Sequence, residues 1–244
     1  MKILILAAGP ADTAADGDAY PALLAEEQGM LLVERTVERC QTIAGTQLIF
    51  AVRDEDIRRH HLDKVIQLVA KEAVVVPVSG TTAGAACTAL LAIEHIADDD
   101  ELLILNGNEI VDVDFAAVTR AFREARWDGG VVTFPSVHPR YSYVRKDADG
   151  LVQQAAEKEP ISRHATAGFY WYRRGSDFVR AAQAMIRKGD TVGGLYYICP
   201  AFNQMVLRQA RIGTYLIQAG QYRPVKSRRQ RELLEEAALR GGHV

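Results

Sequence analysis

Four short stretches of this 244-residue chain combine small and polar residues in a way that suits a phosphorylated ligand. The first, Leu6-Ala7-Ala8-Gly9, follows an apolar run, and its small residues would let a base or a phosphate lie against backbone N–H groups. The second, Thr82-Ala83-Gly84-Ala85-Ala86, would offer the free N–H groups of a helix start to a phosphate or a base carbonyl. Each also has a purely structural interpretation: a tight turn for the first, and Thr81 or Thr82 as an N-cap for the second.

The other two stretches carry side chains that could bind phosphate, sugar or metal. Asn106-Gly107-Asn108-Glu109 offers amide and carboxylate oxygens, of which hard cations such as Mg²⁺ prefer the carboxylate. Glu157-Lys158, followed by Thr166-Ala167-Gly168, combines an ammonium for a phosphate with a carboxylate that can accept a hydrogen bond from a hydroxyl. The structural interpretations are a turn for the first pattern and a solvated charged corner for the second.

The segments that position these stretches alternate between strand-like and helix-like patterns. Continuous apolar runs, typical of strands buried on both faces, occupy residues 2–8, 48–52, 73–78 and 102–105. Helical spacing of apolar residues follows at 31–43, 54–69, 83–97 and 114–126, the last with Asp114 as N-cap. Repeated β-α units predict an α/β fold with a mostly parallel sheet, whose ligands bind beyond the carboxyl ends of the strands. The first three stretches are therefore expected at one edge of that sheet.

The second half of the chain is richer in strands. Strands are expected at 130–134, 141–146, 151–157, 166–172 and 212–217, with a turn at 147–150 that makes the second and third of them a β-hairpin. Helices are expected at 176–188 and 198–209, and a charged amphipathic helix at about 227–240. Because no linker or shift in composition interrupts the chain, residues 1–244 are predicted to form a single domain.

Composition excludes several classes of protein. The 29 basic and 31 acidic side chains give a net charge of −2, which argues against binding to nucleic acid or to a membrane surface. Cys40, Cys87 and Cys199 form no CxxC pair, so we expect reduced thiols and a cytoplasmic location. The N-terminal apolar run is shorter than a secretory signal, and no run approaches the ~20 residues that membrane insertion needs.

In their order and spacing, the four stretches resemble the sugar-nucleotidyltransferases, which are nucleotide-diphospho-sugar pyrophosphorylases. The resemblance extends from residue 1 to about 217 and includes Gly29 with the helix that begins near Leu31. It implies a Rossmann-like GT-A fold, in which a mostly parallel central sheet is flanked by helices and a small β-hairpin subregion is added. The chain is similar to the branch of this family found in capsule and surface-polysaccharide gene clusters.

The resemblance implies transfer of a nucleoside monophosphate from an NTP to a sugar 1-phosphate or a similar phosphorylated small molecule, with release of pyrophosphate and with Mg²⁺ as cofactor. The nucleotide would bind at Leu6–Gly9 and at Thr82, Gly84 and Ala85. The acceptor would bind at Asn106, Glu157, Lys158, Thr166 and Gly168. Lys158 and Asn108 would be catalytic, and Asn108, which stands where relatives carry a metal-binding Asp, would bind the metal together with Glu109.

The sequence also departs from the family pattern. The loop at 9–21 lacks the family's Arg and Lys and contains Asp12, Asp16 and Asp18, which we regard as candidate replacement metal ligands. The family's second metal-binding Asp has no counterpart at 221–226. Positive charge could instead come from Arg140, Arg145 or Arg163.

Three functions therefore remain open: an active nucleotidyltransferase, a homologue that binds nucleotide or sugar phosphate without catalysis, and a GT-A glycosyltransferase. The glycosyltransferase alternative rests on Asp112-Val113-Asp114. This segment has the Asp-x-Asp pattern that such enzymes need, but it lies a few residues after the expected position. The sequence is compatible with a homodimer, which is the commonest oligomer.

Overall fold

The computed structural model describes residues 1–9 and 20–225. Its large sheet has the order β10-β9-β11-β6-β1-β4-β5, and β8 joins β11 to β12. The nine strands are β1 (Lys2–Ala7), β4 (Gln47–Arg53), β5 (Val74–Val78), β6 (Leu102–Asn106), β8 (Gly129–Pro135), β9 (Ser142–Lys146), β10 (Val152–Glu157), β11 (His164–Tyr172) and β12 (Ile212–Leu216). Strands β5, β4, β1 and β6 are parallel neighbours, whereas β11 is antiparallel to β6, β8 and β9.

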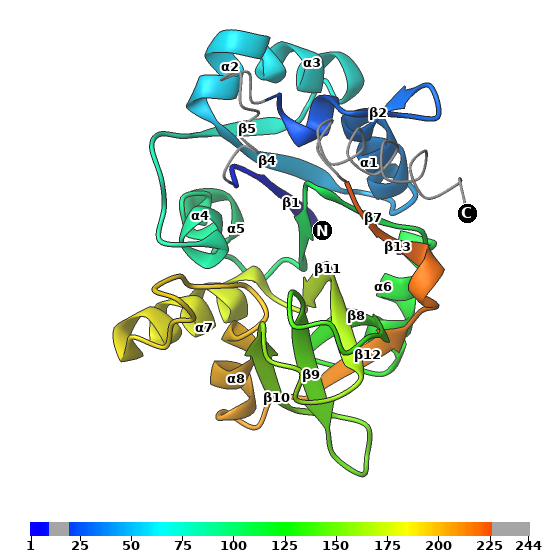
Figure 1. The fold of residues 1–244 in the computed structure, drawn as a ribbon, viewed down its shortest axis with the longest axis vertical. Coiled ribbons are helices and arrows are strands. Elements are labelled where there is room, and N and C mark those ends of the chain that lie inside the picture. The colour runs from blue at the N-terminus through cyan, green and yellow to red at the C-terminus, as the bar shows by residue number, and fades with distance from the viewer. Residues whose placement is uncertain (10–19, 226–244) are drawn as a thin grey trace, which may run out of the picture.

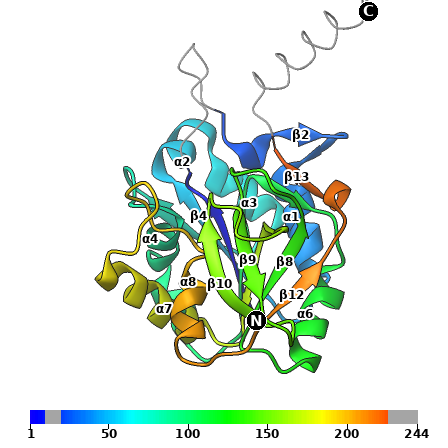
Figure 2. The same ribbon diagram turned by 60° about the horizontal axis from the view of Figure 1, so that its bottom comes forward.

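Helices cover both faces of this sheet (Figures 1 and 2). One face is packed by α1, α3 and α6, and the other by α4, α5, α7 and α8. The α-helices are α1 (Leu32–Gln41), α2 (Asp54–His60), α3 (Leu62–Val69), α4 (Ala85–Leu90), α5 (Ile93–Ile96), α6 (Phe115–Glu124), α7 (Gly175–Lys188) and α8 (Ala201–Val206). The predicted α/β fold, with a central sheet flanked by helices and a β9-β10 hairpin, is confirmed. None of the helices within 1–9 and 20–225 is long and apolar enough to cross a bilayer.

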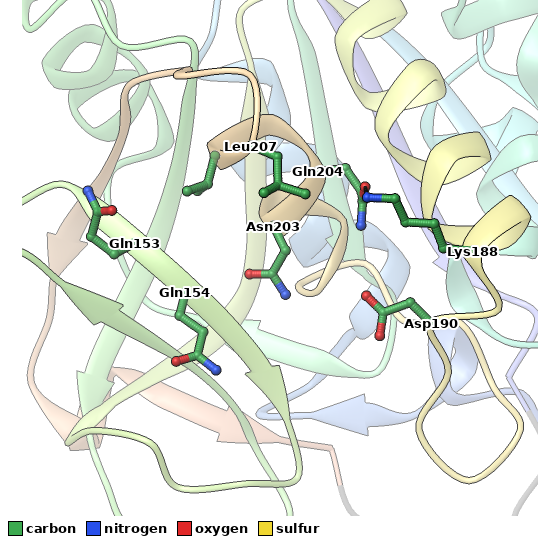
Figure 3. Close-up of a pocket in the computed structure, with 8 residues that line it drawn as sticks. Gln153, Gln154, Lys188, Asp190, Asn203, Gln204 and Leu207 are labelled. Carbon is green, nitrogen blue, oxygen red and sulfur yellow. Dashed lines mark hydrogen bonds between the residues drawn. The ribbon is translucent and has the colours of Figure 1, made fainter.

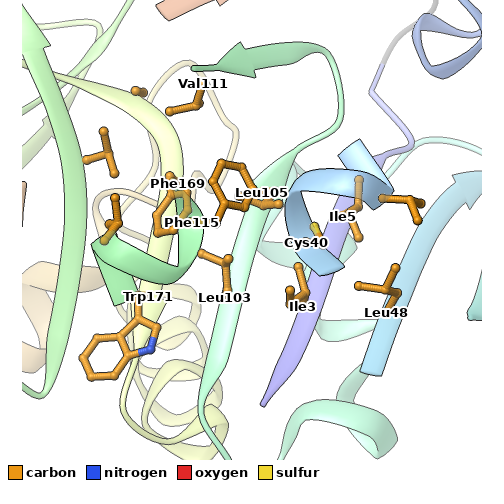
Figure 4. Close-up of a cluster of buried hydrophobic side chains, with 14 of the residues drawn as sticks. Ile3, Ile5, Cys40, Leu48, Leu103, Leu105, Val111, Phe115, Phe169 and Trp171 are labelled. Carbon is orange, nitrogen blue, oxygen red and sulfur yellow. The ribbon is translucent and has the colours of Figure 1, made fainter. Parts of the chain in front are cut away.

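The core explains why these segments adopt regular structure. Alternate residues of β1, β6 and β11 point to opposite faces, so that Ile3, Leu103 and Trp171 are buried on one side and Leu4, Ile104 and Tyr170 on the other. On the first side, Phe115 of α6 packs edge-to-face on Phe169 at a centroid distance of 5.0 Å (Figure 4). Burial of such large aromatic side chains contributes strongly to the stability of the core.

Local signals account for some helix boundaries and fail for others. Asp114 caps α6 as predicted, since its Oδ1 accepts hydrogen bonds from Ala116 N at 2.9 Å and Ala117 N at 3.2 Å. The single helix expected at 54–69 is wrong: His61 has φ +51°, and this left-handed residue separates α2 from α3. The helix expected at 83–97 is likewise divided into α4 and α5, and the one at 198–209 is shortened to α8.

Several short elements were not predicted. They are a 3₁₀ turn at Ala22–Leu24, another at Ala219–Gln221, the hairpin of β2 (Glu26–Glu27) with β3 (Met30–Leu31), and the pair of β7 (Glu109–Val111) with β13 (Tyr222–Pro224). All three cysteines lie within the described residues, and none of them forms a disulfide, as expected. The predicted helix at 227–240 lies outside the described residues.

Candidate active site

The carboxyl ends of β1 and β6 meet, as the sequence predicts. Leu6 and Asn106 are register partners, and Gly107 N donates a hydrogen bond to Leu6 O at 2.8 Å. A Cβ at Gly107 would lie 2.9 Å from that oxygen and 3.0 Å from the Ala7 Cβ. A side chain at position 107 would therefore be too close to β1, which favours glycine there. The stretches Leu6–Gly9 and Asn106–Glu109 lie side by side at one edge of the sheet.

The stretch Thr82–Ala86 forms a loop that is fixed by a distant segment. Tyr196 N donates to Ala83 O at 2.8 Å, and Ala86 N donates to Tyr196 O at 3.0 Å. Gly84 (φ +110°) lies between these two bonds and is the N-cap of α4, without a side-chain cap bond. The N-cap interpretation of Thr81 or Thr82 is therefore wrong, and Thr82 Oγ1 instead lies 2.7 Å from Thr88 Oγ1. Because Ala86 packs in the same cluster as Leu4 and Leu6, the loop lies on the face of the sheet next to β1.

The pair Glu157-Lys158 ends β10 with its two side chains in different environments. Glu157 is buried and accepts a hydrogen bond from Ser142 Oγ. Lys158 is exposed and has φ +57°, a left-handed conformation that is uncommon for a residue other than glycine. Its backbone N donates to Tyr141 O at 3.0 Å, and its Nζ donates to Tyr197 Oη at 3.0 Å. One end of the site thus offers a positive charge and a buried carboxyl on adjacent residues.

Strand β11 brings Gly168 next to the end of β6. The register of β11 shifts between Thr166 and Tyr170, whose hydroxyls lie 2.9 Å apart, and Gly168 within this bulge has φ +61°. A Cβ at Gly168 would overlap Glu109 Oε2 and lie 2.7 Å from Asn106 Nδ2. Glycine is therefore required at 168, since Glu109 and Asn106 occupy the space that a side chain there would fill.

Glu109 and Glu157 form a pair of carboxyls whose charge is disfavoured. Burial raises the pKa of Glu109 to about 7, hydrogen bonds from Asn106 and Tyr222 oppose this rise, and the charge of Glu157 adds to it. Burial also raises the pKa of Glu157, against the hydrogen bond from Ser142 and the charge of Lys158. Within the described residues Glu109 Oε2 has no hydrogen-bond partner. Glu109 lines a cavity of about 20 Å³, and Arg35 and Arg39 are also part of its wall.

Replacing Glu109 with glutamine should make stability less dependent on pH. Because folding raises the pKa of this carboxyl from 4.5 to about 7, its stabilising contribution is fully present below pH 4.5 and is lost as the pH rises through 7. Between pH 5 and pH 8 the wild type should therefore lose about 2–3 kcal/mol more unfolding free energy than Glu109→Gln. Urea denaturation of both proteins at the two pH values measures this difference, and identical pH dependences would show that Glu109 does not titrate in this range.

Comparison with known proteins tests the resemblance directly. The family model described as nucleotidyl transferase matches residues 18–192, which is more than half of the chain. The chain belongs to this nucleotidyl transferase family. Comparison with curated protein sequences gave no match.

Solved structures give the fold of this nucleotidyl transferase family member independently. A nucleoside-diphosphate-sugar pyrophosphorylase from Vibrio cholerae RC9 superposes with a TM-score of 0.78 at 21% identity, covering 95% of this chain and 98% of that one. A UDP-glucose pyrophosphorylase complexed with UDP-glucose has a TM-score of 0.67 at 15% identity, with coverages of 89% and 90%. These likenesses confirm the predicted pyrophosphorylase fold over almost the whole chain.

The proposed metal ligands do not by themselves fit a resident Mg²⁺. Asn108 is exposed and neutral, and its backbone oxygen accepts a hydrogen bond from Val225 N at 2.8 Å. Glu109 turns its carboxyl into the bulge at Gly168, so this pair supplies at most one charged oxygen. Within 1–9 and 20–225, no three His, Cys, Asp or Glu side chains gather around a common point. Asp12, Asp16 and Asp18 lie outside the described residues, and metal binding by Asn108 and Glu109 stays a prediction.

The Asp-x-Asp pattern at 112–114 already has structural partners. Asp112 Oδ1 accepts a hydrogen bond from Arg39 Nη2 at 2.7 Å, and Asp114 caps α6.

The three candidate arginines are exposed. Arg140 stacks on Tyr141, with its Cζ 4.7 Å from the ring centroid. The carbonyl oxygen of Tyr141 accepts the hydrogen bond from the backbone N of Lys158.

A hollow of about 590 Å³ lies elsewhere, between α7, α8 and the edge strand β10 (Figure 3). Gln153, Gln154, Lys188, Asp190 and Leu207 line it, and Asn203 there bonds both backbone groups of Ala155. None of the predicted site residues contributes to this hollow. The hollow is therefore a feature separate from the predicted site, on the edge of β10.

Proposed function

We propose that this nucleotidyl transferase family member transfers a nucleoside monophosphate from an NTP to a sugar 1-phosphate or a similar phosphorylated small molecule, and releases pyrophosphate. The observation that carries the proposal is Lys158, whose exposed ammonium is held by Tyr197 and which directly follows the buried Glu157 in the chain. Together the pair suits an acceptor with a phosphate at one end and hydroxyls at the other. Following the sequence resemblance, we place the reaction in the supply of precursors for a surface polysaccharide. The unpaired cysteines favour a cytoplasmic location, and a homodimer is compatible with the sequence.

The reaction is an in-line displacement at the α-phosphorus. A phosphate oxygen of the acceptor forms a new bond to the α-phosphorus, while the bond to the oxygen that bridges to the β-phosphorus breaks and pyrophosphate leaves with its electron pair. Such transfers depend mainly on positioning and on neutralising charge. In this proposal Leu6–Gly9 and Thr82–Ala85 hold the nucleoside, Lys158 binds the acceptor phosphate and Glu157 accepts a hydrogen bond from an acceptor hydroxyl. The Mg²⁺ that the resemblance implies would neutralise part of the charge of the triphosphate.

Asn106, Thr166 and Gly168 complete the proposed acceptor site. Asn106 lies at the end of β6 against Gly168, and the bulge at Gly168 keeps the Thr166 and Tyr170 hydroxyls together. In this proposal the Asn106 amide and the Thr166 hydroxyl, which lies against the Tyr170 hydroxyl, are hydrogen-bonding groups for the acceptor. Such groups match the hydroxyls of a sugar.

A thermal-shift panel tests this function. Each NTP is added with and without Mg²⁺, first alone and then with candidate sugar 1-phosphates. A ligand present at 100 times its Kd stabilises the protein by about 2.7 kcal/mol, which is a readable shift. Stabilisation by one NTP with Mg²⁺ is expected and would identify the base. If only a sugar phosphate or a nucleotide sugar stabilises the protein, nucleotidyl transfer is the wrong reaction.

The second candidate, a binding protein without catalysis, rests on the loop at 9–21 without Arg or Lys and on Asn108. The variant Asn108→Asp separates it from the active enzyme. If the protein is an active enzyme whose metal binding does not depend on residue 108, Asn108→Asp should change its Mg²⁺-dependent kcat by less than about threefold. A rise of about 10²-fold, the size that restoring one electrostatic group gives, would mean that catalysis has decayed from an ancestral enzyme. Pyrophosphate release at several Mg²⁺ concentrations measures the change.

A glycosyltransferase is disfavoured as a third candidate. Its Asp-x-Asp would have to be Asp112 and Asp114, and both carboxylates already have partners within the protein. The hydrogen bond from Arg39 and the Coulomb attraction of the same residue lower the pKa of Asp112, as an ion pair does. Using either carboxylate as a metal ligand would break a contact that supports α1 or α6.

A further inference from the structure

The ammonium of Lys158 makes two contacts with one aromatic residue. Its Nζ donates a hydrogen bond to Tyr197 Oη at 3.0 Å and lies 5.2 Å from the centroid of the Tyr197 ring. A lysine side chain is long and flexible, so a hydrogen bond and a cation–π contact to the same ring together restrict where its charge can be. The backbone of Lys158 is fixed as well, in its left-handed conformation and by the bond to Tyr141 O.

The segment that carries Tyr197 is attached to the opposite half of the site. It begins with a tight turn at Gly193 (φ +59°) and Gly194 (φ +77°), closed by the bridge between Val192 and Leu195. Tyr196, the next residue, is hydrogen-bonded through its backbone to Ala83 and Ala86. Adjacent residues of one segment therefore contact the loop proposed to bind the nucleotide and the lysine proposed to bind the acceptor.

We propose that Tyr197 is a positioning residue, which holds the Lys158 ammonium at a fixed place relative to the nucleotide loop before the acceptor binds. The inference rests on the proposed function, since it assigns Lys158 to the acceptor phosphate. The acceptor then meets a charge that is already in place, and its phosphate takes over the hydrogen bond that Tyr197 Oη accepts in the free protein. Preorganisation of this kind lowers the entropic cost of binding.

The electrostatics of Lys158 agree with this assignment. The hydrogen bond to Tyr197 and the Coulomb interaction with it raise the pKa of the ammonium, with a smaller contribution from Glu157 and against a small effect of burial. The charge of Glu157 is the smallest of these contributions. Tyr197, rather than the neighbouring carboxyl, is therefore the main partner of Lys158.

The first test needs no catalytic activity. The full chain without substrates is acetylated with limiting acetic anhydride over a range of pH, and each lysine is quantified by peptide mass spectrometry. In Tyr197→Phe, which keeps the ring and loses the hydroxyl, labelling of Lys158 at pH 8 should rise about threefold, as expected for loss of one exposed hydrogen bond. The exposed Lys71 is the internal reference, and Tyr215→Phe on β12 is the matched control variant. Unchanged labelling of Lys158 in Tyr197→Phe would overturn the proposal.

The second test separates positioning from a merely structural role. In Tyr197→Phe the KM for the acceptor should rise about five- to tenfold while the KM for the NTP stays within twofold, and Tyr197→Leu should show a larger rise. Equal increases in both KM values, with a lowered Tm, would mean that Tyr197 only supports the fold and would overturn the proposal. If the wild type shows no turnover with any substrate pair, the proposed function fails, and the labelling result alone decides the role of Tyr197.

Discussion

Replacing Lys158 with alanine should lower kcat/KM for the acceptor about 10²–10³-fold, the usual cost of removing one electrostatic group from a transition state. The KM for the NTP should stay unchanged, because Lys158 contacts Tyr197 and not the loop at 82–86. The fold should be unaffected, since the side chain is exposed and alanine can keep the backbone bond to Tyr141 O. Steady-state kinetics with each substrate varied in turn, and Tm by thermal denaturation, measure these effects.

The matched variant for this test is Lys158→Arg. Arginine keeps the positive charge but is planar and longer, so it should retain part of the activity and cannot reproduce the same contact with Tyr197 Oη. An acceptor KM that stays the same in Lys158→Ala would show that the phosphate is bound elsewhere. The exposed Arg140, which stacks on Tyr141, would then be the first alternative.

The variant Gly84→Ala should weaken NTP binding more than tenfold and also destabilise the protein by about 2–4 kcal/mol. A Cβ at this position would overlap the carbonyl oxygen of Tyr196 and lie 2.6 Å from its backbone nitrogen. These atoms belong to the backbone, so the whole segment around Tyr196 has to move, and the hydrogen bonds to Ala83 and Ala86 are strained. The φ of +110° adds a conformational cost that glycine does not have.

Gly80→Ala provides the control, because it shares the positive φ without the overlap. Gly80 has φ +68°, and a Cβ there would have no neighbour within 4 Å. Alanine at this position should therefore cost only about 1–2 kcal/mol and leave NTP affinity unchanged. Calorimetric titration with the NTP and thermal denaturation compare the two variants. Equal behaviour of Gly84→Ala and Gly80→Ala would show that the loop at 82–86 does not depend on Tyr196.

Local signals in the sequence predict the parts of this fold that depend on neighbouring residues. The apolar runs of β1, β4, β5 and β6 identify the parallel half of the sheet, and Asp114 identifies the start of α6. Because parallel strands end at one edge, this pattern also predicts that Leu6–Gly9 and Asn106–Glu109 meet. The order of the short stretches identifies the family, which the match over residues 18–192 confirms.

The features that were not predicted depend on contacts between distant segments. Gly84 belongs to a helical pattern in the sequence, but pairing with Tyr196 fixes its φ at +110° and delays the start of α4. Glu109 is predicted as a metal ligand, but nothing in the sequence indicates that its carboxyl lies against Gly168 and is hydrogen-bonded by Tyr222. Nothing near Lys158 in the sequence indicates Tyr197. The one local signal around Tyr197 is the Gly193-Gly194 pair shortly before it. This pair predicts a turn, but it does not indicate that Tyr197 contacts Lys158.

Release of pyrophosphate tests the central claim most directly. The wild-type protein is incubated with Mg²⁺, the NTP that stabilises it and each candidate sugar 1-phosphate, and pyrophosphate is quantified together with the nucleotide product. We expect release that requires both substrates and equals the amount of nucleotide sugar formed. If the NTP binds but no acceptor gives pyrophosphate above the background of NTP alone, the protein binds nucleotides without transferring them, and the proposed reaction is wrong.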